Sequence, residues 1–314
     1  MMKSFFKIVA AVLMVVVVGG LIAGWYFYAK DYGSYFAKRH GILAHFDLRP
    51  AGGDSLTERS WVTLENGDGF TVDCGLLAPR EKDRRFPAIV LMGGKATGKY
   101  AIDYALGIRD VIIVAPDYSY DPRDSYTVME FLSDVPEIRQ ALLDMVPAVM
   151  LVTDYLWQRD DVDTTKLVLL GYSFGAPFVP CIIAHDRRAA VAAMVYGGGQ
   201  LRSLIRHNVA RYEGVLVSES VGLLGGMLLH PLEPLRYINE VSPTPLIMIN
   251  GVHDEQIPKE NVQLLYDKAK EPKKIIWLES RHVNRRDVEL TKLIVRTLTE
   301  ELARLKILEL PQRR

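Results

Sequence analysis

The sequence predicts an α/β protein with a mostly parallel sheet flanked by helices. Short apolar runs, each typical of a strand buried on both faces, alternate with longer segments of helical periodicity. Strands that alternate with helices favour parallel pairing, with helices on both faces of the sheet. Ahead of this part, two β-rich runs flank the sequence NGDG at 66–69, which predicts an antiparallel hairpin because glycine and asparagine tolerate positive φ.

An uncharged apolar run at 8–29 precedes the folded part. At about 1.5 Å per residue it spans about 30 Å, the thickness of the hydrocarbon of a bilayer. Lys3 and Lys7 precede the run, and bulky aromatic residues at 25–28 end it, as in an interfacial belt. We expect a tail and transmembrane anchor over 1–29. A cleaved signal peptide is the alternative, although its apolar core is usually only about 7–15 residues long and followed by small residues.

The orientation of this span is set less clearly, because Lys30, Lys38 and Arg39 follow it and the count of basic residues does not decide. A short basic tail ahead of a single span most often stays in the cytoplasm. We therefore expect a single-pass membrane protein whose folded domain is extracytoplasmic.

Residues 30–59 lack clear periodicity and are rich in glycine, which predicts a linker next to the membrane. The folded domain is expected over 60–314. Its strands after the hairpin are predicted at 87–94, 111–118, 166–172, 190–199, 245–251 and 273–280. Its helices are predicted near 97–108, 135–159, 174–185, 259–270 and 286–307. Pro147 lies inside the second helix and should kink it.

The composition excludes little else. The chain has 38 basic and 38 acidic residues, and no stretch is basic enough to indicate a nucleic-acid partner. Its two cysteines, Cys74 and Cys181, are not spaced for metal binding. We expect both to be small buried apolar residues rather than a disulfide.

A serine follows the apolar run KLVLL at 166–170, inside the sequence GYSFG at 171–175. Ligands of parallel sheets bind beyond the C-terminal ends of the strands, which is where Ser173 would lie. Glycines on either side of such a turn remove side chains at a point where strand and helix pass closely. The following helix would point its free N–H groups toward the site. This context predicts an exposed nucleophile, whereas an ordinary strand-to-helix turn is the plainer interpretation.

A serine nucleophile needs a base, and His282 lies just beyond the last predicted strand, at the same edge of the sheet. His253, also at a strand end, is the weaker candidate. A histidine base needs an acceptor for its other N–H, and Asp254 lies just beyond the preceding strand. Glu255 is adjacent and could substitute for it. Three such residues, each beyond a different strand, predict a catalytic triad of Ser173, Asp254 and His282.

The GYSFG pentapeptide, the chain order serine, aspartate, histidine, and the loop NGVHDEQIP at 250–258 resemble the α/β-hydrolase superfamily, in particular its esterase and dienelactone-hydrolase branch. The resemblance covers about 60–314. It implies that backbone N–H groups of Phe174 and of Gly94 or Lys95 form an oxyanion hole. Two features depart from the family. Met92-Gly93-Gly94 stands where the family often has His-Gly, and the segment PDYSYDPRDSY replaces the usual glycine-rich stretch after the next strand.

An insert at about 200–244 is far longer than an ordinary loop, and in α/β-hydrolases a cap often occupies this position. Its apolar segment at 217–235 indicates either a lid that binds an acyl group or a helix packed on the body. Cap chemistry does not name a substrate.

The function these observations predict is a membrane-anchored serine hydrolase that cleaves a carboxylic ester or thioester through an acyl-enzyme on Ser173. The alternatives are a peptidase or acyltransferase of the same fold, and a non-catalytic binding protein that retains the fold. The expected partners are a small-molecule ester or acyl compound and, through residues 8–29, the lipid bilayer. No nucleic acid, metal or organic cofactor is implied.

Overall fold

The computed structural model describes residues 14, 18–19, 24–25, 30–94, 97–104, 108–120, 128–284 and 286–309. These residues form a nine-stranded sheet with the order β1-β2-β3-β5-β4-β6-β7-β8-β9. The strands are β1 (Leu43–Gly53), β2 (Thr57–Asn66), β3 (Thr71–Pro79), β4 (Phe86–Met92), β5 (Ile112–Pro116), β6 (Val162–Tyr172), β7 (Val191–Val195), β8 (Leu246–Gly251) and β9 (Lys273–Leu278).

The direction of pairing divides the sheet into two parts. Strands β4 to β9 pair in parallel, and each of their shared ladders has one register over most of its length. Strands β1, β2 and β3 form an antiparallel meander, and β3 joins the rest of the sheet by antiparallel pairing with β5. The predicted hairpin joins β2 to β3. The expectation of an α/β fold with a mostly parallel sheet is confirmed.

Helices lie on both faces of the sheet. The α-helices are α2 (Tyr32–His40), α3 (Val128–Trp157), α4 (Phe178–His185), α5 (Leu201–Val209), α6 (Val215–Leu228), α7 (Pro234–Val241), α8 (Lys259–Lys268) and α9 (Val288–Arg304). Three 3-10 helices, η1 (Gly98–Tyr104), η2 (Ser173–Gly175) and η3 (His230–Leu232), complete the described elements. Pro147 lies inside α3, and a second proline, Pro136, lies near its start.

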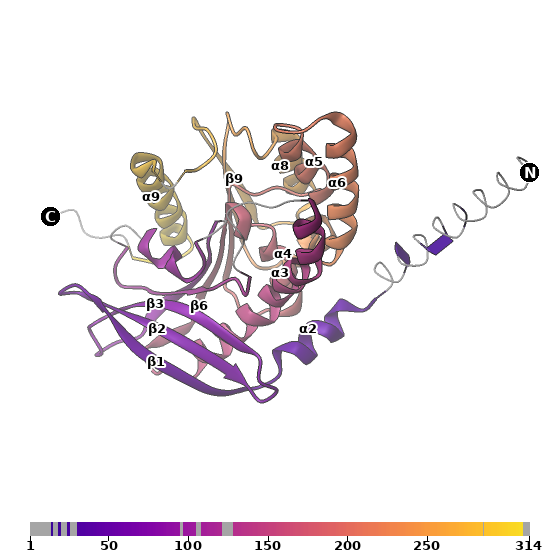
Figure 1. Ribbon diagram of the computed structural model, residues 1–314. Helices are drawn as coiled ribbons and strands as arrows, with labels where there is room; N and C mark the ends of the chain where they lie inside the picture. Colours follow the sequence, from indigo (N-terminus) through magenta and orange to yellow (C-terminus); the bar gives the residue numbers. More distant parts are fainter. Residues whose placement is uncertain are drawn as a thin grey trace, which may run out of the picture.

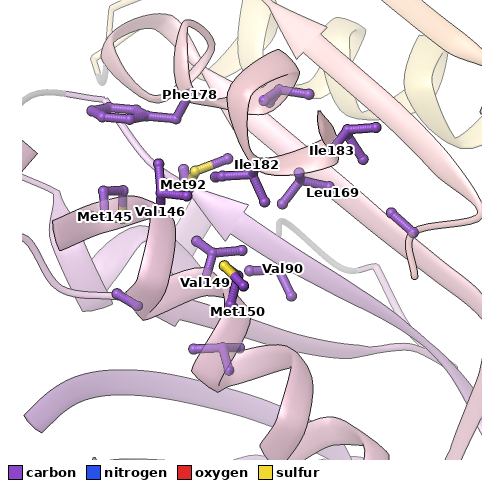
Figure 2. Close-up of a cluster of buried hydrophobic side chains, with 14 of the residues drawn as sticks. Val90, Met92, Met145, Val146, Val149, Met150, Leu169, Phe178, Ile182 and Ile183 are labelled. Atoms are coloured by element: carbon purple, nitrogen blue, oxygen red, sulfur yellow. The ribbon is translucent and has the colours of Figure 1, made fainter. Parts of the chain in front are cut away.

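Alternate side chains of the central strands enter two separate cores. Val90 and Met92 of β4 face the core formed with α3 and α4, where they pack among methionines, valines and isoleucines of both helices (Figure 2). Ile89 and Leu91 face the other core, which α9 and η1 cover. Figure 1 shows α9 on one side of the sheet and α3 and α4 on the other. Burial on both faces explains why these strands are continuous apolar runs in the sequence.

The helix predicted over 97–108 is a 3-10 helix in its described part, η1. Its backbone packs directly on β3, since a Cβ atom added at Gly75 would lie 2.2 Å from the carbonyl oxygen of Lys99. Gly98, the first residue of this helix, has a φ of +44°, which lies outside the range of every right-handed helix.

Residues 30–59 are not the linker that the sequence suggested. Asp31 caps helix α2 by accepting from the backbone N–H groups of Gly33 and Ser34. Phe36 of α2 is 0% exposed and lies in the core beside α3 and α4. Most of the rest of the segment is β1, an edge strand that pairs with β2 along its length. The first helix of the domain therefore begins directly after the predicted span.

The predicted transmembrane run at 8–29 lies outside the described residues except at 14, 18–19 and 24–25. Within the described part of the chain, no single helix is both long and apolar enough to cross a bilayer. Helix α6 passes such a test only together with the stretch His230–Val241, from which it is bent by 67°.

The side chain of Phe36 tests whether α2 belongs to the folding unit. Replacing Phe36 with alanine removes a fully buried ring, which should lower the free energy of unfolding by about 3–5 kcal/mol. Ile42→Ala, in the same segment but 81% exposed, should change it by less than about 0.5 kcal/mol. Urea denaturation of the full chain in mild detergent, followed by tryptophan fluorescence, measures both. Equal midpoints for Phe36→Ala and the wild type would show that α2 is dispensable for the core.

Candidate active site

Three of the predicted site residues meet at the C-terminal edge of the sheet. Ser173 follows β6, Asp254 lies in the loop after β8, and His282 lies in the loop after β9. The parallel registers of β6 to β9 bring the ends of these strands to one edge. Residues more than a hundred positions apart in the chain, Ser173 and His282, are therefore neighbours in space.

The turn that carries Ser173 depends on two glycines. A Cβ atom at Gly171 would lie 2.5 Å from the carbonyl oxygen of Gly175, and one at Gly175 would lie 2.2 Å from the carbonyl oxygen of Met92. Between them Ser173 has a φ of +52°, which non-glycine residues rarely adopt and which costs on the order of 1–3 kcal/mol. In this backbone conformation the Ser173 side chain points toward the loop that carries His282.

Hydrogen bonds join the three side chains in a row. The Ser173 hydroxyl lies 2.8 Å from Nε2 of His282. Nδ1 of the same ring lies 2.9 and 2.8 Å from Oδ1 and Oδ2 of Asp254. A carboxylate only accepts, so Nδ1 carries the proton and Nε2 is left to accept from the serine. The side chains of His282 and Asp254 are 4% and 2% exposed.

The backbone holds the Asp254 carboxylate in place. Its Oδ1 accepts from the N–H groups of Gln256 and Ile257, at 2.8 and 2.9 Å. These bonds leave the carboxylate little freedom to rotate. The buried negative charge is therefore satisfied by backbone donors on one side and by the imidazole on the other, as burial of a charge requires.

Glu255, the alternative acceptor, has a different place. Its carboxylate accepts from the backbone N–H of His282 at 3.2 Å rather than from the ring. Burial acts to raise the pKa of Glu255, but the backbone N–H groups of Glu255 and His282 outweigh it and lower this pKa. The side chain is therefore an ionised clamp on the histidine loop at neutral pH.

The insert supports this loop from outside. Nε2 of His207 in α5 donates to the carbonyl of Glu255 at 3.0 Å, and Nδ2 of Asn208 donates to the carbonyl of Gln256 at 2.8 Å. Helix α6 packs closely on α5 through Gly222 and Gly226. The insert thus packs on the body of the domain, and its α5 braces the loop that carries Asp254.

The ring of Tyr196 supports His282 from below. Tyr196 follows β7, is 0% exposed, and meets the imidazole edge to face with ring centroids 5.5 Å apart. Its hydroxyl is hydrogen-bonded to the hydroxyl of Ser280. The imidazole therefore has one fixed orientation, set by Asp254 and by this ring.

The proposed oxyanion donors are placed in part. Gly94 lies beside the nucleophile, since a Cβ atom added to it would be 3.9 Å from Cβ of Ser173. Phe174 is in the 3-10 turn η2, and the first N–H groups of such a turn have no acceptor within it. Lys95 lies outside the described residues. The role of these donors stays a prediction.

Two side chains that sequence analysis did not select hold the Gly93-Gly94 loop. The hydroxyl of Tyr118 donates to the carbonyl of Gly93 at 2.5 Å, and that of Thr97 donates to the carbonyl of Gly94 at 2.7 Å. Burial raises the pKa of Tyr118, so this hydroxyl stays a donor at neutral pH. Tyr118 belongs to the segment PDYSYDPRDSY, which departs from the family pattern. Its side chain holds the Gly93-Gly94 loop, where the sequence also differs from the family's usual one.

The competing histidine, His253, lies elsewhere. Its Nε2 pairs with Glu279 at 3.0 Å, and its side chain is 63% exposed.

The two cysteines are free and buried, as the sequence predicted: Cys74 and Cys181 form no disulfide. Burial raises the pKa of both thiols, which leaves them unreactive side chains of the core.

A cavity of about 360 Å³ adjoins Ser173 and His282. Its other described lining residues come from β4, β5, β6, η1, α9 and the loops after β4, η1, β8 and β9, and none of them comes from the insert. The site therefore combines a strained serine, an oriented histidine and an adjacent space for a ligand.

Among comparisons with known proteins, those with solved structures bear on the fold. No protein-family model matches the chain. The uncharacterized protein YfhR of Escherichia coli (strain K12) is 29% identical over 127 residues, which cover 40% of this chain and 41% of that protein. The chain thus matches about two fifths of the length of this curated relative. Acetyl xylan esterase 1 from Thermoanaerobacterium sp. JW/SL YS485 has a TM-score of 0.62 at 13% identity, covering 86% of this chain and 94% of that one.

A further solved structure carries the name of the fold. The α/β hydrolase GrgF from Penicillium sp. sh18 has a TM-score of 0.52 at 18% identity, covering 78% of this chain and 98% of that one. At these identities the likeness concerns the path of the backbone. Together with the strand order, it shows that this chain has the α/β-hydrolase fold.

Proposed function

We propose that this protein is a membrane-anchored serine hydrolase that cleaves a carboxylic ester or thioester through an acyl-enzyme on Ser173. The observation that carries the proposal is the row of hydrogen bonds from the Ser173 hydroxyl through His282 to Asp254, at 2.8 to 2.9 Å. The row ends at a serine in a strained turn beside a cavity. The acetyl xylan esterase with the same fold lends support, because its name describes ester cleavage.

The mechanism follows from the tautomer. His282 Nε2 takes the proton of the Ser173 hydroxyl as the oxygen attacks the ester carbonyl, and Asp254 stabilises the imidazolium that forms. The tetrahedral oxyanion would accept from backbone N–H groups of Phe174 and Gly94, each worth about 2.7–4 kcal/mol in such sites. His282 then gives the proton to the departing alkoxide. Water repeats the sequence on the acyl-enzyme and releases the acid.

Membrane attachment is the second part of the proposal. It rests on the uncharged run at 8–29 and on the position of the domain that follows it. Helix α2 begins at Tyr32, directly after the run, and the Tyr32 hydroxyl accepts from Arg139, which also donates to the carbonyl of Leu228 in α6. The domain is therefore fixed close to the end of the run. We propose a single retained span with the domain on the extracytoplasmic side.

Labelling by a fluorophosphonate tests the nucleophile. The full chain in detergent should be labelled, and Ser173→Ala should abolish labelling and lower kcat on p-nitrophenyl butyrate by about 10⁴-fold or more. Ser220→Ala, at an exposed serine of α6, is the matched control and should behave as the wild type. A folded wild-type protein that takes no label would favour the non-catalytic binding protein. Acid release without transfer to added alcohols would separate hydrolysis from acyl transfer.

The two neighbouring carboxylates are expected to differ in effect. Asp254→Asn would present an amide to Nδ1 and favour the wrong tautomer of His282, which should lower kcat by about 10⁴-fold. Glu255→Gln keeps an acceptor for the backbone N–H of His282 and should lower kcat less than about tenfold. Steady-state turnover of the same ester measures both variants. Equal losses in the two would contradict the assignment of Asp254 as the partner of the ring.

Charge in the predicted span tests the anchor. Replacing Val16 and Val17 with lysine should release the protein from membranes, since each charge at the centre of a span costs about 2.5–3.5 kcal/mol on insertion scales. The double leucine variant at these positions is the control. Alkaline extraction of membranes measures retention, and intact mass reports whether 1–29 is kept. A mature chain that lacks these residues would establish the cleaved signal peptide. Protection of the domain from protease added outside intact cells would show that it lies on the cytoplasmic side instead.

A further inference from the structure

The cavity beside Ser173 runs down between the sheet and α9. Its walls are side chains that point to this face from the three central strands, and the facing side chains of the helix. The wall residues that matter here are Ile89, Leu91, Ile113, Leu170, Ile294 and Leu298. All six belong to the core that α9 covers. The cavity is therefore an opening in that core rather than a groove on the surface.

The strand registers give its depth. Ile89 of β4 pairs with Val168 of β6 and with Ile113 of β5. Val168 lies four positions before Tyr172, the last residue of β6, and at about 3.3 Å per residue this places Ile89 about 13 Å below the end of the strand that carries the serine. The space thus extends well into the domain from the reacting hydroxyl.

The polarity of the lining changes along this path. The charged and amide side chains that line the cavity, Glu255, Gln256 and Asn284, come from the loops at the C-terminal edge, next to His282. The walls between strands and helix are mainly aliphatic, although Tyr104, Tyr172 and Thr291 also line them. A ligand that fills the space therefore has a polar end at the edge of the sheet and an apolar chain below it.

Building on the proposed hydrolase, we propose that this cavity binds the acyl chain and that the enzyme's substrates are esters of medium-length fatty acids. His282 must protonate the leaving alcohol and later activate water, and both events need the open, polar end of the site. The acyl group stays bonded to Ser173 in between, so the apolar part of the cavity suits it. The volume limits its length: at about 30 Å³ for a group the size of water, the cavity of about 360 Å³ holds roughly twelve such groups.

A series of p-nitrophenyl esters tests the chain length. With the full chain in a fixed detergent, kcat/KM should be greatest for octanoyl and decanoyl esters, at least about tenfold above acetyl, and should fall by hexadecanoyl. A maximum at acetyl would overturn the proposal. So would a steady rise through hexadecanoyl, which indicates partition of the substrate into micelles rather than a cavity of limited size.

Variants of α9 place the effect in the cavity. Leu298→Trp fills the space and should lower the ratio of octanoyl to butanoyl kcat/KM at least about tenfold. Ile294→Ala lengthens the space and should move the maximum toward dodecanoyl. Leu293→Trp, on the same helix but 37% exposed, is the matched control and should keep the wild-type profile. The proposal is wrong if neither Leu298→Trp nor Ile294→Ala moves the profile.

Binding without catalysis separates this proposal from the proposed function. Calorimetry on Ser173→Ala should detect 2-nonanone at least about tenfold more tightly than 2-butanone, since apolar area drives the difference. The preference should disappear when Leu298→Trp is added. Preferential binding of the longer ketone with no ester turnover by the wild type would remove the hydrolase and keep the apolar-chain site. Turnover of esters with equal binding of the two ketones would keep the hydrolase and remove the apolar-chain site.

Discussion

The close passage of the chain at Gly171 and Gly175 is the constraint on which the site depends. At Gly175 the turn touches the backbone of β4, and at Gly171 it touches itself, so neither position has room for a side chain. This contact fixes where the serine can lie relative to β4, and Ser173 adopts its positive φ between the two glycines. The Ser173 hydroxyl must reach Nε2 of His282 from this position. The turn therefore constrains where the other site residues can lie.

The rest of the structure holds the partners of Ser173 against that fixed point. Asp254 is bound by two backbone N–H groups, its loop is braced by α5 of the insert, and the imidazole rests on the ring of Tyr196. Strain of about 1–3 kcal/mol at one residue is tolerable because the two cores on either side of the sheet supply far more apolar burial. A rigid sheet edge thus maintains a conformation that an isolated turn would lose.

The features that could be predicted from the sequence are those whose signals lie in neighbouring residues. The central strands were predictable because burial on both faces makes them continuous apolar runs, and the serine turn because its glycines are adjacent to it. The fold of 30–59 was not, since β1 is an edge strand with mostly exposed side chains and no apolar alternation. Tyr118 and Tyr196 were missed for another reason: their partners, Gly93 and His282, are distant in the chain, and only the fold makes them neighbours.

The proposed anchor and the proposed apolar acyl cavity serve one requirement. A medium-length fatty ester partitions between water and lipid, and a domain whose first helix begins directly after the proposed span would be held where such esters concentrate. The acyl chain of the substrate would then move from lipid to a cavity with aliphatic walls, so the free-energy cost of its transfer is small. The ester group would be brought to the polar edge of the sheet. Displacing water from that cavity also strengthens the hydrogen bonds around His282, because they act in a medium of lower dielectric. The core opening beneath Ser173 would thus position the substrate and sharpen the electrostatics of its cleavage.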